Sequence, residues 1–268
     1  MVKFHDKDIS KYSFLVTGGA GFIGSNIVEY LLHHNAKKVV VLDNLSTGFE
    51  ENIKPFFTPS DGGDRASVFQ FIKGDICDLK VCSSILQNER IDFIFHQAAL
   101  GSVPRSIENP VATHNANASG FLAVLAAAKN SQVKRIVYAS SSSVYGDSID
   151  SPKQEKKIGK PLSPYAVSKL VNEFYADIFA RTYAMEIVGL RYFNIFGPKQ
   201  NPKGAYAAAI PLFIDGLLHN KPVFINGDGE QSRDFTFVEN AVQANIRAMF
   251  CENKEALGTV FNIAVGEK

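Results

Sequence analysis

The chain has 268 residues, enough to bury a large core in one big domain or two modest ones. Hydrophobic residues make up 46% of it, charged residues 21%, and the formal net charge is +1, so nothing resembles a polyanion-binding stripe. No apolar run is long enough to span a bilayer, and we expect neither a nucleic-acid partner nor a membrane anchor. Cys77, Cys82 and Cys251 lack metal-ligand spacing, which predicts reduced thiols in a cytoplasmic protein and no metal site.

Short apolar runs alternate with helical stretches through residue 193. This alternation predicts an α/β fold, with a Rossmann-type doubly wound parallel sheet covered on both faces. The expected strands are 13–17, 38–43, 68–73, 91–96, 135–140 and 186–193. The expected helices are 22–33, 79–88, 110–130 and 164–183, and residues 49–66 read as an irregular excursion.

The pattern changes from Asn194 onward, where loop-forming residues surround a helix expected near 210–218. An extended segment over 234–237, a helix over 238–250 and a strand over 260–265 follow. We therefore expect a first domain over 1–193 and a smaller, incomplete domain over 194–268, with about 234–265 packing back on the first. An end at Lys268, directly after a strand, is typical of a chain cut short.

A glycine triplet lies between the first expected strand and the helix after it. Gly18, Gly21 and Gly24 have the spacing G-x-x-G-x-x-G, which permits a tight turn and a close approach of the backbone to a pyrophosphate. Asp43 ends the next strand, 19 residues after Gly24, where a carboxylate accepts ribose hydroxyls and repels a 2′-phosphate. The pattern predicts a dinucleotide site that prefers NAD. The alternative for Asp43 is an ordinary turn or cap residue.

Tyr165 is the one tyrosine with a lysine four residues on, Lys169. These positions share a helix face, so the ammonium can approach the phenol and lower its pKa. A shift of about three units corresponds to roughly 4 kcal/mol, which one lysine plus a cationic nicotinamide ring can supply. Tyr165 then becomes a base for a sugar hydroxyl near neutral pH. The alternative is an amphipathic helix with a half-buried tyrosine and a solvated lysine.

With these motifs in this order, residues 10–268 resemble the extended short-chain dehydrogenase/reductases. In that family the position of Ser141 carries a hydroxyl that binds the reacting group, which makes Ser141 catalytic beside Tyr165 and Lys169. Asn117 matches a family asparagine that stabilises the fold, and a purely structural role is the alternative. The resemblance implies cofactor contacts from Gly18, Gly21, Phe22, Ile23, Gly24, Asp43, Asn44, Ser46, Thr47, Gly48, Asp75, Ile76, Gln97, Ala98, Ala99, Asn117, Tyr165 and Lys169.

Two serines distinguish the reaction within this family. The related sugar-nucleotide 4,6-dehydratases carry an Asp-Glu pair after the catalytic hydroxyl, as acid and base for water loss. Here the positions are Ser142 and Ser143, which have no pKa near 7. Elimination is therefore disfavoured, and the remaining chemistry is oxidation at C4 followed by return of the hydride to the other face, an epimerisation.

Three segments, 96–106, 191–198 and 204–211, resemble the UDP-N-acetylhexosamine 4-epimerases of bacterial surface-polysaccharide pathways. Arg233 would clamp the diphosphate, with an exposed loop arginine as the alternative, and Ser102 could instead be a loop cap. Arg105 is a further candidate at the sugar, with a solvent-facing role equally open. The resemblance implies substrate contacts from Ser102, Ser141, Ser142, Ser143, Tyr165, Asn194 and Arg233.

Full-length members of that subgroup continue for about 70 residues past the point that matches Lys268, and that part carries a second arginine and the residue that gates the N-acetyl group. Three readings stay open: a UDP-N-acetylhexosamine or uronic-acid 4-epimerase, an enzyme acting at C4 of another UDP-hexose or UDP-hexuronate, or a dinucleotide-binding fragment without activity. The relatives pair through two long helices, here 110–130 and 164–183, so we expect a homodimer with a four-helix contact.

Overall fold

A computed structural model describes residues 1–57, 67–201, 209–225, 227–230 and 232–266. Parts of the expected 49–66 excursion and 204–211 segment, namely 58–66 and 204–208, lie outside the described residues. The centre is a seven-stranded sheet in the order β3-β2-β1-β4-β5-β6-β9, and all its strand pairs are parallel. Its strands are β1 Ser13–Thr17, β2 Lys38–Asp43, β3 Phe69–Lys73, β4 Phe93–His96, β5 Arg135–Ser141, β6 Ile187–Tyr192 and β9 Val260–Ile263.

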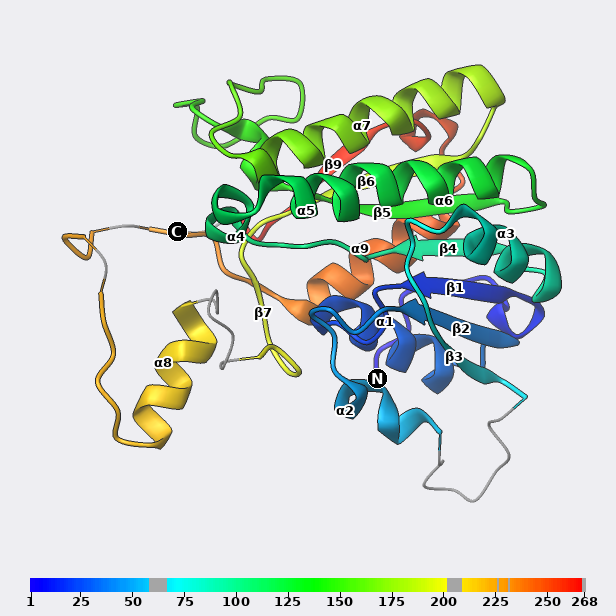
Figure 1. The fold of residues 1–268 in the computed structure, drawn as a ribbon, viewed down its shortest axis with the longest axis horizontal. Helices are drawn as coiled ribbons and strands as arrows, with labels where there is room; N and C mark the ends of the chain where they lie inside the picture. Colours follow the sequence, from blue (N-terminus) through cyan, green and yellow to red (C-terminus); the bar gives the residue numbers. More distant parts are fainter. Residues whose placement is uncertain (58–66, 202–208, 226, 231, 267–268) are drawn as a thin grey trace.

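Helices cover both faces of this sheet (Figure 1). On one face, α1 (Phe22–His33) packs beside α9 (Val238–Phe250), over a core that includes Phe14 and Val16 of β1. On the other face lie α3 (Leu79–Asn88), α6 (Gly120–Lys129) and α7 (Pro164–Tyr183), over a core that includes Leu15. Successive residues of a strand point to opposite faces, so an uninterrupted apolar run is what a sheet buried on both sides requires. The predicted doubly wound fold is confirmed.

The expected helix over 110–130 consists of three pieces in one continuous run. These are α5 (Pro110–His114), a π-helical turn (Asn115–Ser119) and α6. Before it lies a short helix, α4 (Val103–Glu108), which the sequence analysis did not identify. The Ser102 hydroxyl caps α4 by accepting a hydrogen bond from the Arg105 amide, a common helix start.

The remaining elements are short and mostly peripheral. α2 (Glu50–Ile53) lies within the region expected to be irregular, and β7 (Ile195–Phe196) pairs in parallel with β8 (Thr236–Phe237). α8 (Ala209–Leu218) lies apart from the sheet (Figure 1). The chain then returns through α9 to β9, which pairs with β6 at the sheet edge. In the part of the chain described here, no helix is both long and apolar enough to cross a membrane.

Candidate active site

A pocket of about 740 Å³ opens at the carboxyl ends of β1, β2, β4, β5 and β6. This edge is where doubly wound sheets bind ligands. The structure brings nineteen of the residues expected at the site to its walls: Gly18, Gly21, Phe22, Ile23, Gly24, Asp43, Asn44, Ser46, Thr47, Asp75, Ile76, Gln97, Ala98, Ala99, Ser141, Ser142, Tyr165, Lys169 and Asn194.

The glycine loop leaves no room for side chains. Gly18 has φ +69°, and a Cβ there would lie 2.5 Å from the Ala98 backbone nitrogen. A Cβ on Gly24, in the first turn of α1, would lie 2.2 Å from the Gly18 carbonyl oxygen. Loop and helix are therefore in backbone contact, and the amino end of α1 faces the pocket with unpaired N–H groups and a positive dipole. This arrangement fits a dinucleotide pyrophosphate.

Asp43 is buried at the end of β2, and both its oxygens bind the backbone. Oδ2 accepts a hydrogen bond from the Ala20 amide at 3.0 Å, and Oδ1 accepts one from the Leu45 amide at 2.8 Å. Burial raises the pKa of Asp43, and these two hydrogen bonds oppose the rise. The structural alternative therefore describes Asp43 correctly. Because a carboxylate oxygen can accept more than one hydrogen bond and Asp43 lines the pocket, it can also receive a ribose hydroxyl.

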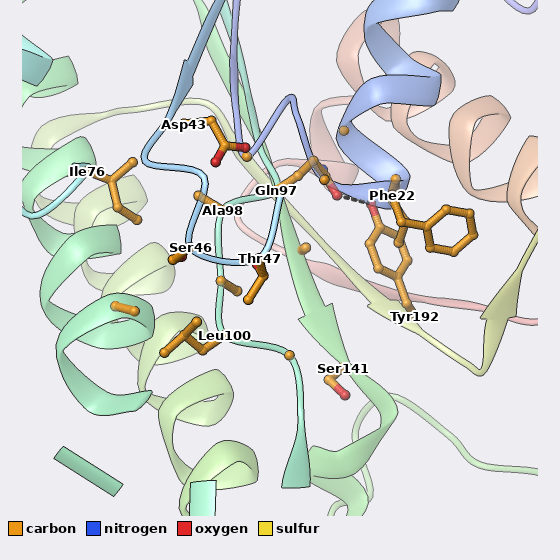
Figure 2. Close-up of a pocket in the computed structure, with 18 of the residues that line it drawn as sticks. Phe22, Asp43, Ser46, Thr47, Ile76, Gln97, Ala98, Leu100, Ser141 and Tyr192 are labelled. Carbon is orange, nitrogen blue, oxygen red and sulfur yellow. Dashed lines mark hydrogen bonds between the residues drawn. The ribbon is translucent and has the colours of Figure 1, made fainter. Parts of the chain in front are cut away.

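The loop after Asp43 forms one wall of the pocket. Figure 2 shows Ser46 and Thr47 on this loop, between Asp43 and Leu100. The Asn44 side chain accepts a hydrogen bond from the Ser46 amide and donates one to Asp75, which joins this loop to the segment after β3. The wall is thus a braced turn suited to the adenosine half of a dinucleotide.

Tyr165 and Lys169 lie on α7 and line the pocket together with Ser141 at the end of β5. The Lys169 Nζ is 6.0 Å from the centre of the Tyr165 ring and donates a 2.9 Å hydrogen bond to the Ala139 carbonyl. Burial lowers the pKa of Lys169 to about 8, against the opposing charge of Glu173. The lysine is buried rather than solvated, so the amphipathic-helix alternative is wrong for it.

The lowered pKa expected for Tyr165 required both Lys169 and a cationic nicotinamide ring, and the protein by itself does not produce it. Burial raises the pKa of Tyr165, and the hydrogen bond with Ser141 opposes the rise only in part. The reason is that loss of solvent disfavours the phenolate more than the nearby groups favour it. Ser141 is thus close enough to Tyr165 to lower its pKa.

Two expected cofactor residues, Gly48 and Asn117, do not line the pocket. Asn117 is fully buried, with its oxygen accepting from the Leu100 amide and its nitrogen donating to the Leu100 carbonyl and the Ser168 hydroxyl. Asn117 therefore holds the Leu100 backbone of the pocket wall in place without facing the pocket, which is the purely structural role given as its alternative. A Cβ on Gly48 would lie 3.0 Å from Ala20 and from the Asp43 carboxylate, so this glycine lets the loop close over them.

Three expected substrate residues also lie off the pocket wall. Ser102 caps α4, as the alternative for it stated. Arg233 is exposed and donates to the carbonyl of its neighbour Ser232, so the exposed-loop alternative describes it. The Ser143 hydroxyl is buried without a hydrogen-bond partner among the described residues. Arg105, by contrast, does line the pocket.

The sequence analysis missed Tyr192, which ends β6 in the pocket. Its hydroxyl donates to the Gln97 side chain at 3.0 Å and accepts from Asn245 of α9 at 2.6 Å, and Gln97 donates to Asn245 at 3.1 Å. Figure 2 shows the bond between Gln97 and Tyr192. Burial raises the pKa of Tyr192 to about 12, so this closed triangle stays uncharged. The rule that ligands meet the carboxyl ends of strands could have identified Tyr192.

Comparison with known proteins agrees with this geometry. Residues 14–264 match the NAD dependent epimerase/dehydratase family. The chain belongs to this family. The chain is 35% identical to a UDP-glucose 4-epimerase of Mycolicibacterium smegmatis, over 94% of its own length and 77% of that relative's. A UDP-N-acetylglucosamine 4-epimerase of Methanobrevibacter ruminantium, solved with UDP-N-acetylmuramic acid, superposes with a TM-score of 0.84 and 38% identity, over 96% of this chain and 77% of that one.

A UDP-glucose 4-epimerase of Thermus thermophilus, solved with NAD, superposes with a TM-score of 0.82 and 34% identity, over 95% of this chain and 78% of that one. Family membership and these relatives make the chain an enzyme of the NAD-dependent nucleotide-sugar 4-epimerase class. The predicted cofactor, NAD, is confirmed at this level.

Proposed function

We propose that this enzyme interconverts the C4 epimers of a UDP-N-acetylhexosamine, UDP-N-acetylglucosamine and UDP-N-acetylgalactosamine or their uronic acids, in a surface-polysaccharide pathway. The observation that carries the proposal is the joint presence of Tyr165, Lys169 and Ser141 in one pocket that has no second acid–base pair beside Ser141. Likeness to the UDP-N-acetylglucosamine 4-epimerase supports the N-acetyl sugar.

In this proposal the residues divide the work as follows. The glycine loop and the amino end of α1 hold the pyrophosphate, and Asp43 faces the adenosine ribose. NAD, when bound, supplies a positively charged ring that accepts a hydride and gives it back. Tyr165 removes the proton from the sugar hydroxyl at C4 and later returns it, while Ser141 holds that hydroxyl.

Ser142 and Ser143 favour epimerisation over water loss. Elimination needs a second acid and base beside the reacting carbon, and a hydroxyl with no pKa near 7 cannot serve. The Ser142 side chain lines the pocket, where it can donate to or accept from the sugar. A 4-keto sugar formed here can take the hydride back on the same face, which regenerates the substrate, or turn over and take it on the other face, which gives the C4 epimer.

The second candidate is the same reaction on UDP-glucose or UDP-glucuronate, which the likeness to UDP-glucose 4-epimerases favours. Proton NMR separates the two. The protein is incubated with each UDP-sugar and no added nicotinamide, and the anomeric signal of the C4 epimer is followed. Product from UDP-N-acetylglucosamine supports the proposal, and product from UDP-glucose or UDP-glucuronate alone contradicts it. No product from any sugar would match the non-catalytic fragment.

We further propose that the enzyme works in the cytoplasm as a homodimer, and that residues 194–268 form a partial nucleotide-sugar domain of which about 234–265 packs back on the first domain. The two helices expected to pair both present apolar side chains to solvent. Phe174 and Ile178 of α7 are 61% and 45% exposed, and Val111 of α5 is 68% exposed. An apolar stripe across two adjacent helices is typical of a surface covered by a partner, here a second copy.

A further inference from the structure

Helix α7 is attached to the end of strand β5 one turn beyond the catalytic lysine. The Lys169 ammonium donates to the Ala139 carbonyl, and four residues later the Glu173 carboxylate accepts a hydrogen bond from the Ser140 hydroxyl. Ser140 directly precedes the catalytic Ser141. Successive turns of the helix thus bind successive residues of the strand that ends in the pocket.

Arg191 of β6 completes the attachment with a buried ion pair. Its Nε and Nη2 donate to the two oxygens of Glu173 at 2.9 and 2.7 Å, and both side chains are less than a tenth exposed. Arg191 lies beside Ser140 in the β5–β6 register, so one carboxylate binds both strands. This is a bidentate ion pair, in which two parallel charge-assisted hydrogen bonds join the guanidinium to the carboxylate, and such pairs are among the strong hydrogen-bonded contacts in proteins.

The Arg191 guanidinium makes two further contacts. Nη1 donates to the Glu155 carbonyl at 2.9 Å, and the guanidinium lies 4.9 Å from the centre of the Tyr145 ring. The Tyr145 hydroxyl in turn donates to Asn262 of β9. A buried charge pair that is held by several hydrogen bonds is rigid, and such a pair fixes the relative position of the elements it joins.

We propose that Glu173 and Arg191 are positioning residues of this enzyme: the pair locks the turn of α7 that carries Lys169 against the strand end that carries Ser141, and it places the Glu173 carboxylate one helical turn from Lys169. The proposal rests on the proposed function only in treating Lys169 as a catalytic residue. The contacts of Glu173 and Arg191 exist in the protein without substrate or cofactor.

The charges around Lys169 leave Glu173 as its counter-ion among the described residues. His96 of β4 is close enough to interact with Lys169, but burial lowers the pKa of His96 to about 3, so it is neutral. Tyr165 of α7 is a neutral phenol because burial raises its pKa. The Arg191 charge of β6 is paired with the Glu173 carboxylate. Glu173 therefore opposes the loss of the Lys169 proton.

The test is a pH titration of lysine labelled with ¹³C at Cε, followed by NMR in the protein without substrate. The Lys169→Met variant identifies the Lys169 signal. Glu173→Gln keeps the shape and the acceptor for Ser140 but removes the charge, and we expect the midpoint of Lys169 to fall by about one unit. The matched control is Asp177→Asn, one turn further on α7, where the carboxylate is exposed and paired with Arg181. It should leave the midpoint unchanged.

An unchanged Lys169 midpoint in Glu173→Gln would overturn the proposal, whether or not the enzyme turns over any UDP-sugar. If Glu173→Gln does not fold because Arg191 is left unpaired, the double variant Glu173→Gln/Arg191→Met removes both charges, and a smaller fall in the midpoint is expected because the positive charge of Arg191 is lost together with the negative charge of Glu173. In turnover, the alkaline limb of the kcat profile of Glu173→Gln should move to lower pH with little change in KM. A merely structural role would lower the amount of folded enzyme and leave the limb in place.

Discussion

The Gly24→Ala substitution tests whether the backbone contact between loop and helix makes the cofactor site. An added Cβ would lie 2.2 Å from the Gly18 carbonyl oxygen and 2.9 Å from the Gly19 Cα, where ordinary contacts begin at 3.4 Å. Both atoms belong to the backbone and cannot rotate away, so α1 and the loop must separate by about 1 Å. We expect overpacking to cost about 1–3 kcal/mol of unfolding free energy.

The loss in cofactor binding should be separate and larger in effect. Moving the amino end of α1 lengthens charge-assisted hydrogen bonds to the pyrophosphate, each contributing about 1.5–3 kcal/mol, so NAD affinity should fall by roughly 10- to 150-fold. Calorimetric titration with NAD and urea unfolding followed by circular dichroism measure the two effects. The control is Gly101→Ala in the same pocket, where a Cβ meets nothing within 4 Å. Wild-type affinity in Gly24→Ala would refute the reasoning.

Three further results are expected. Tyr165→Phe should lower kcat by at least about 100-fold, because the base is gone, while calorimetry shows NAD binding unchanged; retained turnover would remove Tyr165 as the base. The pKa of His96 is about 3 in the folded protein, so as the pH falls the unfolded chain takes up this proton first. The free energy of unfolding of the wild type should therefore fall by up to ~1.4 kcal/mol per pH unit below about pH 6.5. Urea unfolding at several pH values should show a smaller fall for His96→Gln. Phe174→Glu should give monomers in sedimentation, and an unshifted dimer would place the contact elsewhere.

Local signals were sufficient for the nucleotide-binding half of the fold. β1, α1 and β2 begin and end at the predicted residues, since a buried apolar run, a glycine turn and a helical period follow one another without a conflicting signal. α3 was equally well marked, because Asp78 caps it by accepting from the amides of Lys80 and Val81. Such signals act within a few residues of each other and are visible in the chain itself.

The remaining features depend on contacts between distant residues. The Gln97–Tyr192–Asn245 triangle joins β4, β6 and α9, and the sequence contains no sign of which amide will meet which hydroxyl. The same holds for Arg191, which reads as an ordinary strand residue until the register places it beside Ser140. Sheet order and register determine both networks, and a single sequence specifies neither directly.

Burial explains why Lys169 alone does not lower the pKa of Tyr165, and why the predicted shift depends on the nicotinamide ring. From the sequence, Lys169 is a full positive charge near a phenol, and nothing indicates that the lysine is buried away from water. In the structure burial lowers the pKa of Lys169 and raises that of Tyr165, so the two shifts act against ionisation of the phenol. A second positive charge facing the pocket is then required for Tyr165 to act as a base near neutral pH. The oxidised nicotinamide ring carries such a charge and the reduced ring does not. With the oxidised ring bound, the pKa of Tyr165 would be lower, so the phenolate that takes the sugar proton would be populated; with the reduced ring bound, the pKa would be higher, so Tyr165 would hold that proton as a neutral phenol until it is returned.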